Sequence, residues 1–549
     1  MNLFALRARI HARRLQVSAA LLAVFASLSL AATASASSSQ VSVIQDGNAQ
    51  SAAADVQQFH ATGAKTLRLL LQWYTVAPKA NSKTAPKFSA TNPNSYPSKN
   101  WSQWDSAIKA ASAAGMTVDL DIVGGPPLWA QGKGVPSRFR QMHFGWKVNA
   151  ADYGKFVTAV AKRYDGHFTP KGASSALPKV SLYSLWNEPN MGQQLGPQSV
   201  DATTRSTGYS VAPGYYRNLL RSGYASLKRS APKGSRILIG ELAGSGRSHN
   251  KSSQYPFGLP GQTSITHPLA WVQTLYCLDS SDHRLTGTAA AMAGCPKSAG
   301  AARSFVKQNP ALFNATAFSV HPYASKLAAD LKASAVPKGN VVLPNIGALV
   351  TDLARVTKAW HHAKTFPVWS TEFGFVTHPP AGSRYPSPAK AAIDLNESEY
   401  RSYKDRSVAS YAQYLMDDPV TDGGSLFDSG LRTSSGKVKP GYNAYRLPLW
   451  MPKQTVTRGT SAEVWGGARP AVYNSSASTV EIQERSSGTW NTLATKTVRK
   501  SNGYFDTHLR FTSGGSVRLA YTYPATDPFL PVGDPGTTVY SRTQKVSVH

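Results

Sequence analysis

The sequence predicts an α/β fold, a (β/α)₈ TIM barrel, followed by a small C-terminal β-sandwich domain. Between Val41 and Trp450, short apolar runs typical of strands alternate with segments of helical periodicity, which is the pattern of a parallel sheet covered by helices. After Trp450 the helical periodicity ends, and Val, Thr, Ser, Gly and aromatic residues dominate. The expected parts are a signal peptide at 1–36, the barrel at 37–450, the β-sandwich at 451–524 and a flexible tail at 525–549.

The first residues have the pattern of a secretory signal peptide. A basic segment that ends at Arg14 precedes the apolar run Val17–Leu30, which is too short to span a bilayer as an ordinary helix. Ala34-Ser35-Ala36 fits a cleavage site, so the mature chain should begin near Ser37 and be secreted. An uncleaved membrane anchor is the alternative. No other apolar run is long enough to span a membrane.

Eight strand–helix units are expected in the barrel. The strands are short runs rich in Val, Ile, Leu and aromatic residues, and the helices carry apolar residues at every third or fourth position. In chain order the strands are Val41–Gln45, Thr66–Trp73, Thr117–Val123, Val180–Trp186, Arg236–Leu242, Ala317–Tyr323, Phe366–Phe373 and a weaker Gly424–Asp428. The helices are Ser51–Ala64, Ser102–Ala114, Ala150–Arg163, Tyr215–Arg229, Leu269–Leu278, Ile346–Trp360, Tyr400–Leu415 and Pro440–Leu447. A doubly wound open sheet is the main alternative, but no Gly-rich nucleotide-binding turn follows any strand.

The C-terminal region reads as a small antiparallel domain. Strand-like runs such as Thr479–Gln483 and Val517–Tyr523 are separated by turn clusters such as Ser486-Ser487-Gly488. The connection from the barrel, Leu449–Gln454, is short. A tethered sugar-binding module would need a longer linker, so we expect this domain to brace the barrel.

The chain is strongly basic, with 59 Lys and Arg against 29 Asp and Glu and a formal net charge of +30. In an exported protein this favours an acidic partner, such as an anionic polysaccharide or a cell wall, although a merely soluble basic surface explains the charge equally well. The basic residues are spread along the whole chain, with no dense basic run and no nucleic-acid motif. Nucleic acid is therefore not expected as a partner.

The two cysteines, Cys277 and Cys295, lie eighteen positions apart. Because an exported protein folds in an oxidising compartment, we expect them to form one local disulfide. No His/Cys cluster has the spacing of metal ligands, so neither a metal site nor a cofactor is expected. The sequence gives no indication of an oligomeric state.

Three of the eight glutamates lie at or near the C-terminal ends of predicted strands: Glu188, Glu241 and Glu372. In a (β/α)₈ barrel this edge carries the active site. Solubility explains these glutamates poorly, because their flanks are apolar. Two carboxyl groups facing each other can cleave a glycosidic bond. A separation of ~5–5.5 Å gives retention of configuration, and one of ~6.5–9.5 Å gives inversion.

The segments Trp186-Asn187-Glu188-Pro189-Asn190 and Ser370-Thr371-Glu372-Phe373-Gly374 resemble the retaining (β/α)₈ glycoside hydrolases of clan A, most of all family 39 and then family 5. His321-Pro322-Tyr323 and the Gly-Pro-Pro-x-Trp run at 125–129 are similar to the same clan. The resemblance implies that Glu188 is the acid/base, that Glu372 is the nucleophile and that Asn187 is the partner of the sugar 2-hydroxyl. It further suggests that Arg68 supports the nucleophile.

The function implied is that of a secreted glycosidase that hydrolyses an extracellular polysaccharide or glycoside by double displacement. A transglycosylase with the same residues and an inactive carbohydrate-binding barrel are the alternatives. The clan often has a Trp on the eighth strand, where this chain offers Phe427-Asp428. This departure leaves the floor of the sugar site undefined.

Other side chains near strand ends are candidates for substrate binding. Four tryptophans could stack on sugar rings, with core packing as the alternative: Trp73, Trp129, Trp186 and Trp369. His321 is expected to form hydrogen bonds in the site, and Tyr323 to donate one to Glu372, which favours the charged carboxylate. Glu241 is expected either to contact substrate or to form a salt bridge at the barrel mouth. No role is assigned to Asp119 and Asp121.

Overall fold

The computed structural model describes residues 37–549 apart from residue 38 and five internal segments, namely 201–207, 248–260, 325–332, 421–426 and 472–475. The predicted signal peptide lies outside the described residues. Among the helices that are described, none has the length and apolar character needed to cross a bilayer.

Eight parallel strands form the central sheet. They are β1 (Val41–Gln45), β2 (Thr66–Gln72), β3 (Thr117–Val123), β4 (Leu182–Leu185), β7 (Arg236–Ala243), β8 (Ala317–His321), β9 (Val368–Ser370) and β10 (Val408–Tyr414). They are hydrogen-bonded in the order β1-β10-β9-β8-β7-β4-β3-β2. The sheet closes because β1 pairs with β10 on one side and with β2 on the other. The predicted (β/α)₈ barrel is thus confirmed.

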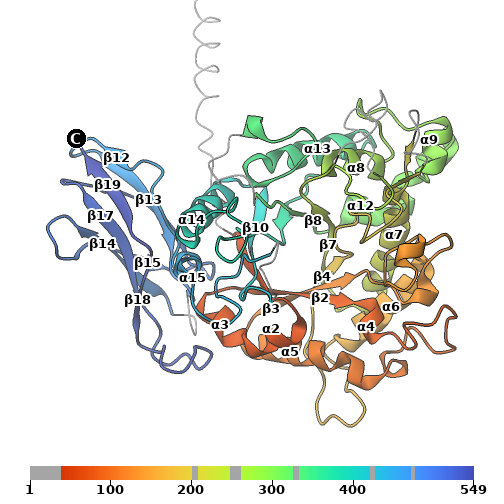
Figure 1. The fold of residues 1–549 in the computed structure, drawn as a ribbon, viewed down its shortest axis with the longest axis horizontal. Helices are drawn as coiled ribbons and strands as arrows, with labels where there is room; N and C mark the ends of the chain where they lie inside the picture. Colours follow the sequence, from red (N-terminus) through yellow and green to blue (C-terminus); the bar gives the residue numbers. More distant parts are fainter. Residues whose placement is uncertain are drawn as a thin grey trace, which may run out of the picture.

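Helices surround this barrel (Figure 1). The longer ones are α5 (Ser102–Ala113), α6 (Ala150–Arg163), α7 (Ala212–Ser230), α8 (Pro268–Leu275), α13 (Gly347–Lys358), α14 (Pro388–Lys404) and α15 (Pro440–Arg446). The shorter ones are α2 (Ala49–Ala54), α3 (Val56–Ala61), α4 (Trp73–Val76), α9 (Gly287–Met292), α10 (Ala299–Arg303), α11 (Phe305–Gln308) and α12 (Pro310–Asn314).

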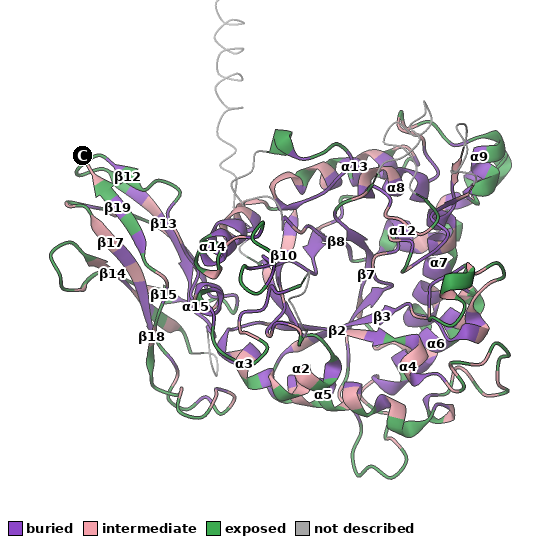
Figure 2. Ribbon diagram, in the orientation of Figure 1, coloured by how far each residue is buried: buried purple, intermediate pink, exposed green. Residues whose placement is uncertain are grey.

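The helices bury their apolar faces against the strands, and the buried apolar residues of the barrel domain form one large cluster (Figure 2). Helix α6 shows how the sequence caps such a helix and buries one of its faces. Asn149 caps its first turn by accepting hydrogen bonds from the backbone N–H groups of Ala151 and Asp152. Phe156 and Val160 on its inner face are fully buried.

The predicted eighth strand, Gly424–Asp428, is wrong. Residues 421–426 lie outside the described residues, and the eighth barrel strand is β10, a run that the sequence interpretation assigned to the end of the helix Tyr400–Leu415. Helix α14 ends at Lys404 because Asp405 adopts an extended conformation. The Asp405 side chain then accepts a hydrogen bond from the backbone N–H of Ser407, which turns the chain into the strand.

The C-terminal domain contains two further sheets. Its strands are β11 (Leu449–Trp450), β12 (Thr455–Val456), β13 (Ser461–Gly467), β14 (Ser478–Arg485), β15 (Asn491–Val498), β16 (Tyr504–Arg510), β17 (Gly515–Thr522), β18 (Thr538–Tyr540) and β19 (Gln544–Val548). One sheet has the order β11-β13-β16, and the other β12-β19-β17-β14-β15 with β18 paired to β17. Their apolar faces form a second core, as expected of a β-sandwich.

The predicted flexible tail at 525–549 is wrong. Strands β18 and β19 both pair with β17 in the larger sheet. In β19, Gln544 and Val546 are buried while Lys545 is exposed, so the short run alternates as a half-buried strand does. The Gln544 amide also donates to the carbonyl of Met451, and this fixes the end of the chain onto the domain.

The β-sandwich lies beside α14 and α15 (Figure 1). Tyr403 of α14 packs against Trp465 and Tyr504 of the sandwich. Arg469 is buried in the same contact, where its guanidinium donates to the Tyr445 carbonyl at 2.8 Å, to the Tyr504 hydroxyl at 2.9 Å and to the carboxylate of Glu399. The two domains therefore share a packed interface with a buried ion pair.

The predicted disulfide between Cys277 and Cys295 is present. It joins the chain just after α8 to the chain just after α9, and both cysteines are buried. The bond therefore closes the short excursion that contains α9.

Candidate active site

Polar side chains from the barrel strands converge at their carboxyl-terminal ends. Arg68 lies on β2 and is fully buried. Its guanidinium donates to Asp121 at 2.7 Å, to Asn187 at 2.8 Å and to Glu241 at 3.1 Å through one nitrogen, Nη2. Through the other, Nη1, it donates to Gln45 and to Glu372, each at 2.5 Å. One buried cation thus links β1, β2, β3, β7 and the segments that follow β4 and β9.

Glu372 follows β9 and is held from both sides. Its Oε1 accepts from Arg68, and its Oε2 accepts from the hydroxyl of Tyr323 at 3.0 Å. The residue is 7% exposed, so only a small part of it is accessible. The expected pairings of Glu372 with Arg68 and Tyr323 are both present. These donors suit an ionised carboxylate, and they fix the direction in which it points.

Glu188 follows β4 and is the more exposed of the two carboxylates, with 16% of its side chain accessible. Its Oε1 lies 3.0 Å from Nδ1 of His321. One oxygen of Glu188 and one of Glu372 lie within 4.8 Å of each other. The two carboxylates therefore face each other across the barrel mouth, in different surroundings.

The backbone around Glu188 is strained. Trp186, Glu188 and Glu241 have φ values of 72°, 43° and 47°, in the left-handed region that non-glycine residues rarely adopt. The backbone N–H of Glu188 donates to the carbonyl of Glu241 at 2.9 Å, so two of these residues support each other. Such strain persists only where the surrounding structure enforces it, and it concentrates at functional sites.

Glu241 is not placed to contact a substrate. It is fully buried, and all its hydrogen bonds go to protein groups: Ser184 at 2.7 Å, Thr371 at 2.6 Å, and Arg68 and His321 at 3.1 Å each. Burial by itself raises the pKa of Glu241, but the charge of Arg68 and the hydrogen bond and charge of His321 lower it to about 2. Of the two roles expected from the sequence, only the salt-bridged carboxylate fits.

His321 lies between the three glutamates. Its Nε2 is 3.1 Å from Glu241, and its Nδ1 is 3.0 Å from Glu188 and 3.5 Å from Glu372. Burial lowers the pKa of this imidazole, but the charge of Glu372 and the hydrogen bonds to Glu188 and Glu241 raise it to about 10. His321 is therefore a doubly protonated donor at neutral pH, in agreement with the expected hydrogen-bonding role.

Asp119 and Asp121, which received no role from the sequence, are part of this network. Asp121 accepts from Arg68, and Asp119 accepts from Ser184 at 3.2 Å. Burial raises the pKa of both carboxyls, that of Asp119 to about 7, and the neighbouring Glu241 charge adds to the effect. The signal for them was the alternation Val-Asp-Leu-Asp-Ile in a predicted interior strand, which requires each buried Asp to have a partner.

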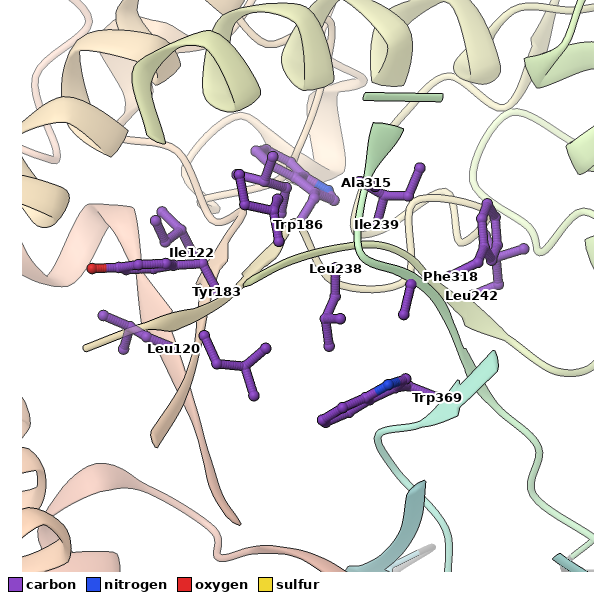
Figure 3. Packing of buried hydrophobic residues seen from close by; sticks show 14 of the residues in the cluster. Leu120, Ile122, Tyr183, Trp186, Leu238, Ile239, Leu242, Ala315, Phe318 and Trp369 are labelled. Atoms are coloured by element: carbon purple, nitrogen blue, oxygen red, sulfur yellow. The ribbon is translucent and has the colours of Figure 1, made fainter. Parts of the chain in front are cut away.

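Three of the four candidate tryptophans belong to the core. Trp73 stacks on Phe156 at a centroid distance of 5.4 Å and is 1% exposed. Trp186 and Trp369 lie among buried apolar side chains (Figure 3). The guanidinium of Arg236, the first residue of β7, lies over Trp369, which places this ring near the amino-terminal end of the barrel. A Trp on a barrel strand or just after one faces either the site or the core, and these three face the core.

Trp129 is different, because it is only partly buried and lies in the loop after β3. Its indole N–H donates to the carbonyl of Pro78 at 3.2 Å, in the loop that follows β2. The ring packs edge-on against Trp73 and Phe88. Trp129 thus remains available at the loop surface on the site's side of the barrel.

One aromatic side chain that the sequence interpretation missed, Tyr414, lies near Glu372. Tyr414, the last residue of β10, makes edge contacts with Tyr323 at 6.1 Å and with Phe427 at 5.5 Å. Phe427 is 44% exposed. Tyr414 therefore takes the place at the end of the eighth strand where a Trp was expected, and it could not be identified because β10 was interpreted as helix.

Glu188, His321 and Glu372 also form a group that could hold a metal ion, since each offers one ligand atom. The fit to a cation is poor. Glu372 already accepts from the Arg68 guanidinium at 2.5 Å, and the raised pKa of His321 keeps a proton on the nitrogen that faces both carboxylates. The donors present suit an organic substrate better than a cation.

No family model and no curated protein matches the chain. Among solved structures, the chain is similar to a family 39 glycoside hydrolase from Bacteroides cellulosilyticus WH2, with 14% identity over 85% of this chain and 79% of that one and a TM-score of 0.43. It is similar to an endo-β-1,4-mannanase from Thermotoga petrophila, with 12% identity over 93% of this chain and 97% of that one and a TM-score of 0.37. It is also similar to a family 1 β-glucosidase from Thermotoga maritima, with 12% identity over 71% of this chain and 84% of that one and a TM-score of 0.42. At these levels of identity and TM-score the likeness carries no functional argument.

Proposed function

We propose that the protein is a clan A glycoside hydrolase that cleaves O-glycosidic bonds with retention of configuration. The observation that carries this proposal is the pair Glu188 and Glu372, whose oxygens approach within 4.8 Å at the carboxyl-terminal end of a (β/α)₈ barrel. Such an approach fits the ~5–5.5 Å separation of retaining enzymes and leaves little room for the water that inversion requires.

In the first step Glu372 is the nucleophile. Its carboxylate attacks the anomeric carbon, forms a glycosyl–enzyme ester, and the bond to the leaving oxygen breaks. Arg68 and Tyr323 hold both carboxylate oxygens, so the attacking atom is oriented before substrate arrives. Glu188 transfers its proton to the leaving oxygen, which departs as a neutral hydroxyl.

In the second step the roles of Glu188 reverse. Now ionised, it removes a proton from water as the water oxygen attacks the anomeric carbon. The ester bond to Glu372 breaks and Glu188 is protonated again. His321 suits both steps, because its Nδ1–H can donate to Glu188 when that carboxyl is charged. Its closeness to Glu372 also allows it to stabilise the departing carboxylate.

Asn187 is the residue proposed to bind the sugar 2-hydroxyl. Its Oδ1 accepts from Arg68, so its amide nitrogen is the group that would donate to the hydroxyl. A hydrogen bond to the 2-hydroxyl that strengthens in the transition state contributes several kcal/mol in glycosidases. Tyr414 and the exposed ring of Phe427 supply an apolar wall beside Glu372 on which a sugar face can pack.

The predicted signal peptide and the basic composition support a secreted enzyme that acts on an extracellular polysaccharide or glycoside. Transglycosylation would use the same residues with a sugar acceptor in place of water. Product analysis with and without an added acceptor separates the two reactions. The predicted bracing role of the C-terminal domain is supported by the packing of Tyr403, Trp465 and Tyr504 across the interface.

Steady-state kinetics on a panel of aryl glycosides and polysaccharides tests the function. Glu188→Gln and Glu372→Gln should each lower kcat by at least ~10²–10⁴-fold on every glycoside that the wild type cleaves. Glu484→Gln, on β14 of the C-terminal domain, is the matched control and should retain wild-type rates. Wild-type rates in either active-site variant, with the control equally active, would contradict the assignment.

A further inference from the structure

Two loops at the mouth of the barrel contain Lys and Arg but no acidic residue. They are residues 73–101, which follow β2, and residues 124–149, which follow β3. Neither contains an Asp or a Glu. Their cations are Lys79, Lys83, Lys87, Lys99, Lys133, Arg138, Arg140 and Lys147. We call these two segments the basic loops.

None of these cations forms an ion pair with a described carboxylate. Some cations elsewhere in the described structure do form such pairs, as Arg432 does with Asp55 and Asp417. A set of unpaired like charges on adjacent loops repels itself, so its positive potential is available to an external anion.

The basic loops line an open cavity of about 280 Å³. Lys83 comes from the first loop, and Lys133 and Arg140 come from the second; all three line the cavity and are exposed. Its other lining residues are neutral: Leu128, Gln131, Gly132, Gly134 and Val135. The cavity therefore presents three cations, one amide and apolar surface to a ligand.

The loops hold this cavity in a defined shape. The backbone N–H of Leu128 donates to the carbonyl of Ala80 at 2.7 Å, and His143 lies 2.9 Å from the Asn81 amide oxygen, so the two loops are tied together. Within the second loop, the Gln131 amide donates to two carbonyls, those of Met142 and Phe144, at 2.8 Å each.

The cavity belongs to the same end of the barrel as the two catalytic carboxylates. The second loop is bonded to the segment that follows Glu188: the N–H of Gly196 donates to the carbonyl of Gly145 at 2.7 Å, and the N–H of Lys147 to the carbonyl of Gly196 at 2.8 Å. Aromatic surface lies in the same loops, with the partly buried Trp129 and the stacked pair Tyr74 and His143 at 4.1 Å. Cations and aromatic rings together are the surface that an acidic sugar chain needs.

We propose that the basic loops form a binding site for the anionic substituents of a glycan, with Lys83, Lys133 and Arg140 contacting one such group in the cavity. The site extends the active site along the substrate and makes an acidic glycan the preferred substrate class. This inference rests on the proposed glycosidase function for its meaning, but the binding itself does not depend on turnover.

The test measures binding of the full mature chain to three polymers that share one backbone: dextran, carboxymethyl dextran and dextran sulfate. Both acidic polymers should bind at least ten-fold more tightly than neutral dextran, with affinity falling as salt rises. The variant Lys83→Ala/Lys133→Ala/Arg140→Ala should bind the acidic polymers about ten-fold more weakly, as expected for three exposed charge contacts. The ratio between carboxymethyl dextran and dextran sulfate identifies which anionic group is preferred.

A charge-matched variant controls for net charge. Lys109→Ala/Lys228→Ala/Lys358→Ala removes three exposed cations from the outer helices α5, α7 and α13 and should bind as the wild type does. An equal loss in both triple variants, or no preference of the wild type for acidic over neutral dextran, would overturn the proposal. Tighter binding of a single-stranded oligonucleotide through the same three residues would overturn the assignment to a glycan.

A single substitution guards against misfolding of the triple variant. If the melting temperature of Lys83→Ala/Lys133→Ala/Arg140→Ala falls below that of the wild type, Lys133→Glu alone should reproduce the loss of binding, because it places a negative charge in the cavity. A well-folded Lys133→Glu that binds the acidic polymers as tightly as the wild type would overturn the proposal.

Hydrolysis of a neutral aryl glycoside separates this proposal from the proposed function. The control variant Lys109→Ala/Lys228→Ala/Lys358→Ala should cleave it at the wild-type rate, because its three positions lie on outer helices and in neither proposed site. If the wild type cleaves no glycoside, the proposed function fails while the dextran result still decides whether the basic loops bind anions.

Discussion

Replacing Glu241 by Gln removes one buried negative charge with almost no change of shape. The amide oxygen can still accept from Arg68, Thr371 and His321, and the amide nitrogen can face Ser184, which already donates to Asp119. The hydrogen-bond geometry is therefore largely kept, and the change tests what the charge contributes.

The magnitude follows from the pKa of Glu241, which is lowered from 4.5 to about 2. A carboxyl whose pKa is lower in the folded state stabilises the fold above its unfolded pKa. This stabilisation is lost as pH falls from 4.5 through 2. A shift of this size corresponds to about 3 kcal/mol at pH 6. The free energy of unfolding of Glu241→Gln should therefore be about 3 kcal/mol below wild type at pH 6, and the difference should shrink towards zero near pH 2.

Chemical denaturation between pH 3 and pH 7 measures this difference, with Glu484→Gln as the control. The variant should also lose activity by ~10–100-fold, because His321 and Arg68 lose the anion that fixes them beside Glu188 and Glu372 and a small misplacement is costly. A destabilisation that is the same at pH 3 and at pH 6 would refute the reasoning, because it would show that the charge of Glu241 does not stabilise the fold.

Three further predictions concern stability. Replacing Cys277 and Cys295 by Ser should lower the free energy of unfolding by ~3 kcal/mol, as the chain-entropy model gives for a closed loop of this length, and an unchanged melting temperature would contradict it. Arg469→Met should cost ~3–5 kcal/mol by leaving the buried Glu399 carboxylate unpaired at the domain interface, whereas Glu399→Gln in the same background should recover part of this loss in thermal melts. Asp119→Asn should become more stable relative to the wild type as pH rises from 4 to 7, by up to ~4 kcal/mol. The reason is that the raised pKa of about 7 makes ionisation of Asp119 unfavourable in the folded state. A difference in the free energy of unfolding that does not change with pH would show that the pKa of Asp119 is not raised.

The strands and the carboxylate pair were accessible to sequence reasoning for physical reasons. A parallel barrel needs short, nearly continuous apolar strands, and a Glu next to Pro189 at the end of such a strand has no structural purpose. The partners of Arg68 were harder to foresee. Its contacts with Asp121 and Glu241 depend on which interior side chains reach the barrel axis, which is set by the closed register of β2, β3 and β7 and by the left-handed backbone at Glu241.

The eighth strand is a case in which the local sequence pattern predicts a helix and the chain forms a strand. The run from Tyr400 to Leu415 contains enough apolar residues at helical spacing to continue α14, and only the turn at Asp405 separates helix from strand. Tyr414 could be predicted as a site residue only if that turn was recognised, because Tyr414 then ends a strand. The expectation that Trp369 stacks on a sugar ring was wrong for a related reason. Trp369 faces the core, and the direction of a ring on a three-residue strand such as β9 cannot be inferred from composition.

The anomeric configuration of the first-formed product tests the central claim most directly. NMR spectra recorded within the first minutes of hydrolysis should show a product with the same configuration as the substrate. In Glu188→Ala, given an activated dinitrophenyl glycoside, mass spectrometry of peptides should find the sugar covalently attached to Glu372, because the second step then lacks its base. A first-formed product of inverted configuration, with no adduct on Glu372, would contradict the account.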